Sequence, residues 1–269
     1  MSRTRLMLLT ACSSLFLVIP LSAQQAIAPT AVPSPSVLLQ KSLAVLVGNV
    51  SISDVTLTGT VRCIAGSDDE SGSATLKALS SGVARTDLNL PSGSRSELTD
   101  LSSIAPSGSS SGPSAVSRAI PFHNLLSEPS WSFPAFSIAR RLSSPAFVAT
   151  YVGHESRDGQ AVEHISISQT PPSADLAATP TFAHLTQIDF FLDSTTLLPV
   201  AITFNIHPDD NELLDIPVEI RFSDYRASGG TQIPFHIQKS LNGSLVLDFR
   251  AQSAVLNSGL TSAQLGGAQ

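Results

Sequence analysis

IPVEIRFSDYRASGGTQIPFHIQKSLNGSLVLDF, residues 216–249, contains three runs in which apolar and polar residues alternate. Alternation with a period of two is typical of strands that have one buried and one wet face. Turn signals separate the runs: Ser-Gly-Gly at 228–230 and Asn-Gly at 242–243, of which Asn-Gly is the strongest short hairpin signal. Consecutive runs are therefore predicted to pair as antiparallel neighbours in a meander.

The same alternation extends upstream through most of the chain. It recurs in residues 55–63, 74–78, 188–192 and 200–206, and Asp158-Gly159 marks a further hairpin. Counting such runs gives about ten or eleven strands, and an open twisted sheet of that size tends to curl. The sequence therefore predicts a mainly β (α+β) fold, in which a curved antiparallel sheet forms an incomplete barrel.

Two segments are available to cover the apolar face of this sheet. Residues 37–47 have the apolar spacing of a short amphipathic helix, with Ser36 as N-cap and Gly48 as stop. Residues 122–142 are apolar and interrupted by prolines, which indicates one or two short helices. Such short covers over a long sheet leave two alternatives, an apolar cleft that can bind a ligand or a fully packed core. The residues expected to line such a cleft are Ile188, Phe190, Phe204, Ile220, Phe222 and Phe235 in the sheet, with Trp131 and Phe136 in the cover.

The ends of the chain are predicted to lie outside this domain. Residues 1–23 read as a secretory signal, 24–36 as a flexible leader and 261–269 as a tail, which leaves 37–260 as a single half-barrel domain. A Ser-rich stretch at 102–117 reads as a loop. The protein is expected to be periplasmic or secreted, without a transmembrane span. A lipobox-like context around Cys12 leaves open an outer-membrane lipoprotein, and Cys63 reads as a buried apolar residue.

Composition excludes several classes of protein. The 269 residues are 42% hydrophobic, which is too much for a wholly disordered chain, and 2 Cys cannot build a disulfide scaffold. With 15 Lys and Arg against 21 Asp and Glu, nucleic acid is not an expected partner. Phosphate-binding glycine motifs are absent from the sequence, so no nucleotide cofactor is predicted.

No residues are predicted to be catalytic or to bind metal. Ser110 lies in a Gly-x-Ser-x-Gly pattern, but the strand and helix that a nucleophile elbow needs are not predicted around it. A hydrolase is therefore only a third hypothesis. The six histidines lack the local spacing of a zinc site. His154, Glu155 and His164 flank a predicted hairpin and are expected to approach one another across strands.

The order of elements resembles the outer-membrane lipoprotein-sorting (Lol-type) carrier superfamily. The resemblance covers about residues 37–260. It rests on the strand at 54–60 and on Asp224-Tyr225, Gly229-Gly230 and Ile233-Pro234, which are structural positions. It implies an incomplete β-barrel that wraps around helices and holds the acyl chains of a lipoprotein. The family's carrier also holds its lid with an arginine inside the cavity, and the sequence does not place that arginine among Arg62, Arg85 and Arg95.

The first functional hypothesis is an exported, non-enzymatic protein that binds an acyl chain or another apolar ligand in the concave face of the half-barrel. The alternative is an envelope protein–protein interaction module with a filled core, because an open barrel has free edge strands that can pair with a partner.

Overall fold

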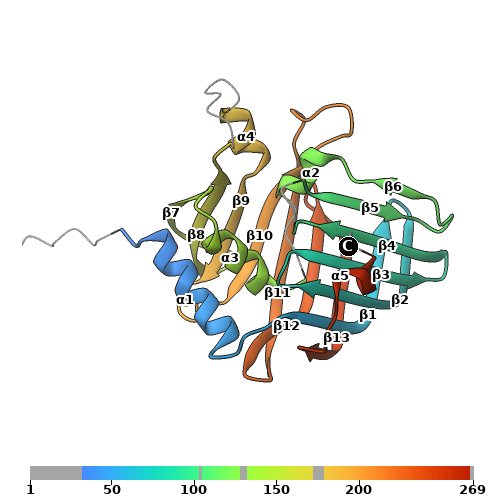
Figure 1. Ribbon diagram of the computed structural model, residues 1–269, viewed down its shortest axis with the longest axis horizontal. Helices are drawn as coiled ribbons and strands as arrows, with labels where there is room; N and C mark the ends of the chain where they lie inside the picture. The colour runs from blue at the N-terminus through green and yellow to red at the C-terminus, as the bar shows by residue number, and fades with distance from the viewer. Residues whose placement is uncertain (1–31, 103–104, 128–131, 172–178, 267–269) are drawn as a thin grey trace, which may run out of the picture. The chain divides into compact units, whose positions relative to one another are not determined.

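The computed structural model describes residues 32–102, 105–127, 132–171 and 179–266. The predicted signal at 1–23, Cys12, most of the leader and Trp131 lie outside these residues. A single antiparallel sheet of 13 strands dominates the described chain, in the order β6-β5-β4-β3-β2-β1-β13-β12-β11-β10-β9-β8-β7 (Figure 1). The mainly β class and the curved, open sheet are confirmed, although the sheet has more strands than the sequence predicted.

The sheet consists of two meanders that meet in the middle. The first meander runs through β1 (Asp54–Ala65), β2 (Asp68–Leu79), β3 (Val83–Leu90), β4 (Gly93–Asp100), β5 (Ser107–Ser111) and β6 (Ser117–Ala119). The second runs through β7 (Phe147–Arg157), β8 (Gln160–Gln169), β9 (Ile188–Asp193), β10 (Pro199–Ile206), β11 (Ile216–Ser228), β12 (Thr231–Leu241) and β13 (Ser244–Leu256). Pairing of β1 with β13 joins the two meanders. The outer strands β6 and β7 do not pair with each other, so the barrel is incomplete.

The predicted hairpin turns form because their asparagine, aspartate and glycine residues accept left-handed backbone angles. Asn242 and Gly243 have φ angles of 49° and 77°, and this left-handed pair gives the twist that suits a two-residue hairpin. The same left-handed pair occurs at 158–159 and at 229–230. These turns connect β12 to β13, β7 to β8 and β11 to β12, as the sequence predicted.

In the part of the chain that the structure describes, five helices accompany the sheet: α1 (Pro35–Val47), α2 (Phe122–Ser127), α3 (Pro134–Ser143), α4 (Thr179–Leu185) and α5 (Ser262–Leu265). Helix α1 begins two residues earlier than predicted, with Ser34 rather than Ser36 at the N-cap. Pro35 explains the shift, because proline is well suited to the first helical position. Gly48 ends the helix with a φ of 56°, as expected.

Two predicted irregular segments contain regular structure. The stretch 102–117, interpreted as a loop, holds β5, which pairs with β4 and β6. That interpretation was wrong for 107–111, because backbone hydrogen bonding to a neighbouring strand does not depend on apolar side chains. The tail at 261–269 contains α5, whose Leu265 is 1% exposed and packs with Leu79 and Val83. The folded part therefore extends beyond residue 260.

The main hydrophobic core lies between the sheet and the first and third helices. Leu39 and Leu46 of α1 and Ile138 of α3 belong to one cluster with the inward side chains of the strands, and Figure 1 shows both helices lying across the sheet. Cys63 is buried in the same cluster, as predicted. Within the described chain, no helix is both long and apolar enough to cross a membrane.

Candidate functional site

A cavity of about 470 Å³ lies where three of the helices meet the ends of the strands. It is bordered by α2, α3 and α4, by the turn after β2, by the end of β4 and by the first residues of β7. Its volume falls within the range of small-molecule sites, about 300–1,000 Å³. The wall includes the apolar side chains of Leu101, Phe122, Leu125, Phe136, Phe147 and Phe182.

Helix α3 contributes both apolar and charged groups to this wall. Phe136 and Arg140 are four residues apart, as are Ser137 and Arg141, so each pair shares one face of the helix. Phe136 packs edge-to-face against Phe133, with 4.7 Å between ring centroids. The helix therefore presents an aromatic ring and two guanidinium groups to the same cavity.

Arg141 is a buried cation. Its residue is 7% exposed, and Nη1 donates a hydrogen bond to the Ser137 carbonyl oxygen at 3.1 Å. The guanidinium also lies 5.5 Å and 5.6 Å from the ring centroids of Phe147 and Phe190. No carboxylate of the described chain pairs with it, and its buried Nε has no hydrogen-bond partner there. Burial, with a smaller contribution from Arg140, lowers the pKa of Arg141 to about 9, so the group remains charged at neutral pH.

Arg140 connects α3 to the first meander of the sheet. Its Nη1 donates to the carbonyl oxygen of Leu101, at the end of β4. Burial lowers the pKa of this guanidinium as well. Two adjacent cations beside an aromatic wall, without a carboxylate partner in the described residues, form an environment that suits an anionic group attached to an apolar body.

The predicted wall residues are buried but do not surround this cavity. All seven that the structure describes lie in the main hydrophobic core, and only Phe136 also lines the cavity. Phe204 and Phe222 border two other hollows, of about 510 Å³ and 220 Å³. The remaining four, Ile188, Phe190, Ile220 and Phe235, are core residues, and a role for them in ligand binding stays a prediction.

Sequence reasoning missed the two cavity arginines. The three arginines considered for the lid position of the family lie elsewhere and are paired: Arg62 with Asp69, Arg85 with Asp87 and Arg95 with Glu70. The available signal was a spacing in the sequence of helix α3. Phe136 is followed four residues later by Arg140, and Ser137 is followed four residues later by Arg141. This signal is weak, because an arginine on an amphipathic helix usually faces water.

The serine pattern does not form a nucleophile elbow. Ser110 lies inside β5, opposite Glu97 on one side and Arg118 on the other. The elbow requires a sharp turn between a strand and a helix. Of the three residues expected to meet across the β7–β8 hairpin, two do: His164 Nδ1 lies 2.7 Å from Glu155 Oε1. The acidic partner of His154 is instead Glu163, whose Oε1 lies 3.0 Å from His154 Nδ1.

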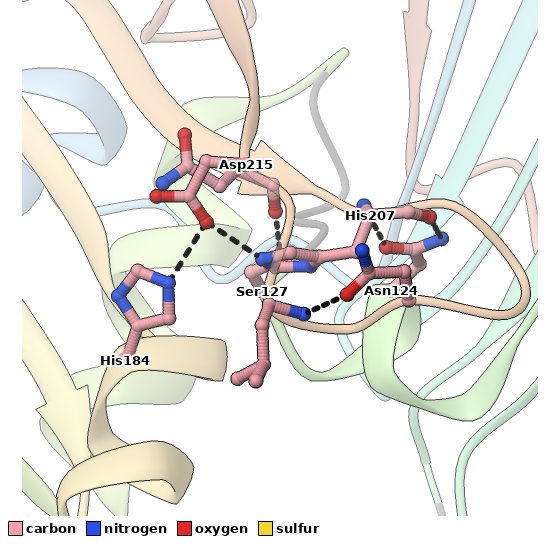
Figure 2. A network of polar contacts seen from close by, with 8 residues as sticks. Asn124, Ser127, His184, His207 and Asp215 are labelled. Atoms are coloured by element: carbon pink, nitrogen blue, oxygen red, sulfur yellow. Dashed lines mark hydrogen bonds and ion pairs between the residues drawn. The ribbon is translucent and has the colours of Figure 1, made fainter.

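A second polar cluster joins side chains that are distant in sequence. His184 Nε2 and His207 Nε2 lie 2.8 Å and 3.0 Å from the same carboxylate oxygen of Asp215 (Figure 2). The sequence predicted no metal site, because no local histidine spacing suggested one. These three residues nevertheless form a group that can hold a metal ion, since their ligand atoms all lie within 4.8 Å of one another.

Comparison with known proteins defines the fold. No protein family and no curated protein sequence matches this chain. Among the solved structures that are similar to it are the following three. A domain named for outer membrane lipoprotein sorting, from Vibrio parahaemolyticus, has a TM-score of 0.54 at 13% identity and covers 86% of this chain and 95% of its own. A LolA superfamily protein from Nitrosomonas europaea has a TM-score of 0.54 at 11% identity, covering 87% of this chain and 98% of that one.

The third similar structure is a DUF1329 family protein from Desulfovibrio piger, with a TM-score of 0.50 at 11% identity, covering 86% of this chain and 95% of that one. The resemblance to the lipoprotein-sorting superfamily is thus confirmed at the level of the fold. At these identities the match concerns the path of the chain and not the residues of a site.

Proposed function

We propose that this chain is an exported protein of the periplasm or cell envelope that binds the acyl chain of an anionic amphiphile and catalyses no reaction. The observation that carries the proposal is the cavity of about 470 Å³ with aromatic walls and two arginines. The fold shared with lipoprotein-sorting and LolA superfamily structures supports it. A lipoprotein acyl chain and a free fatty acid both have the required chemistry.

The energetics favour a ligand with a tail and a charged head. Each methylene moved from water into an apolar wall contributes about 0.8 kcal/mol, so part of an acyl chain is enough for useful affinity. A carboxylate or phosphate would accept hydrogen bonds from Arg140 or Arg141, whose charges have no acidic partner in the described chain. The head group then determines orientation, and the tail supplies most of the binding free energy.

Binding to purified, delipidated protein tests this proposal. Dodecanoate is expected to bind by calorimetry more tightly than dodecanol, which has the same tail without the charge. Phe122 is 55% exposed at the cavity rim, so Phe122→Asp should weaken dodecanoate binding by about tenfold or more without unfolding the protein. The matched control is Val148→Asp, since Val148 is 52% exposed on β7 and does not line the cavity. Equal binding by both variants and the parent would refute the proposal.

Ligand identity is tested on protein isolated from the exporting cell. Native mass spectrometry should show an adduct that organic extraction removes, and the extract should contain acyl lipid in stoichiometric amount. A lipoprotein cargo would instead co-purify as a protein adduct. Protein without any adduct, together with no dodecanoate binding, would eliminate the carrier function.

A protein partner at the sheet edge is the second candidate. Strand β7 is an outer strand of 11 residues, and its Val148 and Val152 are 52% and 51% exposed. An outer strand with exposed valines can accept a strand from another chain. Crosslinking in intact cells from a residue on β7 distinguishes this role: a dominant protein adduct with no bound lipid would favour it over the carrier.

A further inference from the structure

The cluster of His184, His207 and Asp215 is assembled by three different segments. His207 directly follows β10 and Asp215 directly precedes β11. Their neighbours Ile206 and Ile216 are paired across these strands, so the two ends of the connecting loop lie side by side. His184 comes from α4, and Figure 2 shows all three side chains converging on one point.

The cluster is held in place by hydrogen bonds that do not use its ligand atoms. Asn124 of α2 donates from Nδ2 to the His207 carbonyl oxygen at 2.9 Å and accepts from the His207 backbone N–H at 2.7 Å (Figure 2). At the end of α4, Thr186 Oγ1 accepts a hydrogen bond from the Gln169 backbone N–H at 2.9 Å, which ties the helix to β8. The backbone positions of both histidines are therefore fixed by neighbouring elements, which is the preorganisation that a metal site needs.

The central imidazole has unused bonding capacity. The His207 side chain is fully buried, and its Nδ1 has no hydrogen-bond partner in the described chain. The His123 ring lies edge-to-face against it, 5.9 Å between centroids, and His123 Nε2 is likewise buried without a partner there. Buried polar nitrogens are normally satisfied, so these two ring nitrogens are exceptions that lie beside the cluster.

The charge around the cluster favours a cation. The loop from His207 to Asp215 carries Asp209, Asp210 and Glu212, and a surface hollow of about 320 Å³ is lined by them and by His123. Within the described residues, Asp215 forms ion pairs with His184 and His207 and with no lysine or arginine. The Asp215 carboxylate therefore lies near further acidic groups, and their negative field raises the local concentration of cations.

We propose that His184, His207 and Asp215 bind one divalent transition-metal ion, with Zn²⁺ as the preferred ion. Two imidazole nitrogens and one carboxylate oxygen form a three-ligand set typical of open tetrahedral zinc sites. Ca²⁺ and Mg²⁺ prefer oxygen ligands, so the two imidazoles select against them. The side chains of His184 and Asp215 are 40% and 41% exposed, which leaves an open side through which the ion enters and a water completes the coordination.

Bound metal would also connect two walls of the cavity. Helix α4 carries Phe182, and α2, which fixes His207 through Asn124, carries Phe122 and Leu125. Metal binding itself does not depend on the proposed lipid ligand, because no atom of the cluster is needed to line the cavity. The two proposals therefore succeed or fail in separate experiments.

The test uses untagged, chelator-treated protein titrated with Zn²⁺ by calorimetry, with Co²⁺ as a spectroscopic probe. One equivalent of Zn²⁺ should bind, and Co²⁺ should give the intense visible absorption of tetrahedral coordination. His184→Gln and Asp215→Asn should each weaken Zn²⁺ binding by at least tenfold. Both residues are partly exposed, so both variants are expected to fold, which circular dichroism checks.

The control variant is His154→Gln, because His154 is an exposed histidine beside a carboxylate, Glu163, far along the chain from the cluster. It should bind Zn²⁺ like the parent. Mg²⁺ added in excess should not displace the ion. Failure of the parent to bind one equivalent, or binding that is unchanged in His184→Gln and Asp215→Asn, would overturn the proposal.

Discussion

Replacing Arg141 with methionine should separate the stability of this protein from its affinity for ligand. Burial, with a smaller contribution from Arg140, lowers the pKa of this guanidinium from 12.5 to about 9, and this corresponds to a cost of about 5 kcal/mol at neutral pH before the favourable contacts of the guanidinium are counted. The pH dependence of this cost follows from proton binding. The unfolded chain holds the proton more tightly than the folded chain, so the cost is present below about pH 9 and falls as the pH rises further. Methionine retains the length of the side chain and removes the buried charge.

Favourable contacts of Arg141 offset much of this cost. The charged hydrogen bond to the Ser137 carbonyl contributes about 2 kcal/mol, and the guanidinium contacts with Phe147 and Phe190 contribute about 2 kcal/mol together. The balance predicts that Arg141→Met is between equally stable and about 2 kcal/mol more stable than the parent. Urea unfolding followed by circular dichroism at pH 7 measures the difference.

The same substitution should weaken binding of an anionic ligand. Loss of one charged hydrogen bond, about 1.5–3 kcal/mol, corresponds to roughly a 10- to 150-fold weaker affinity for dodecanoate. Dodecanol affinity should not fall. Arg118→Met, at an exposed position of β6, is the control and should change neither property. A loss of stability above about 2 kcal/mol, or an equal loss of affinity for both ligands, would refute the assignment of Arg141 as an unpaired cation that receives the ligand.

Two further predictions concern the scaffold. Asp54 accepts hydrogen bonds from the chain that follows β13, including the Gly259 N–H at 3.0 Å; burial opposes its ionisation, but these bonds outweigh it and hold its pKa below the ordinary value. Asp54→Asn should therefore cost about 1–3 kcal/mol at pH 7. In unfolding experiments the difference should shrink as the pH falls from the ordinary carboxyl pKa of 3.8, where the unfolded chain takes up the proton, through the lower pKa of the folded state. Gly59→Ala should destabilise by more than about 2 kcal/mol, because the new Cβ would overlap the Arg250 carbonyl where β1 meets β13. The control Gly153→Ala should have little effect on the urea midpoint, because a Cβ added there would have open space around it.

The strand pattern was readable because it depends on local rules. In β11 the alternation of apolar and polar residues matches the alternation of buried and solvated side chains, and Asn242-Gly243 adopts the left-handed pair that its residue types favour. Each of these features needs only neighbouring residues, so the meander and the mainly β class followed from the sequence. The pairing of β1 with β13, which completes the sheet, joins the two ends of the domain and has no local signal.

The sites were decided by tertiary structure. The sequence supplied Arg140, Arg141 and six histidines but not their surroundings, because burial of a charge depends on which helix face meets the sheet. Asp215 became a partner of His207 through the register of β10 with β11, and of His184 through α4, a helix whose residues lack a clear apolar period. What a chain can form locally is set by neighbours in sequence, whereas the cavity and the histidine cluster require groups brought together by packing over long separations in the chain.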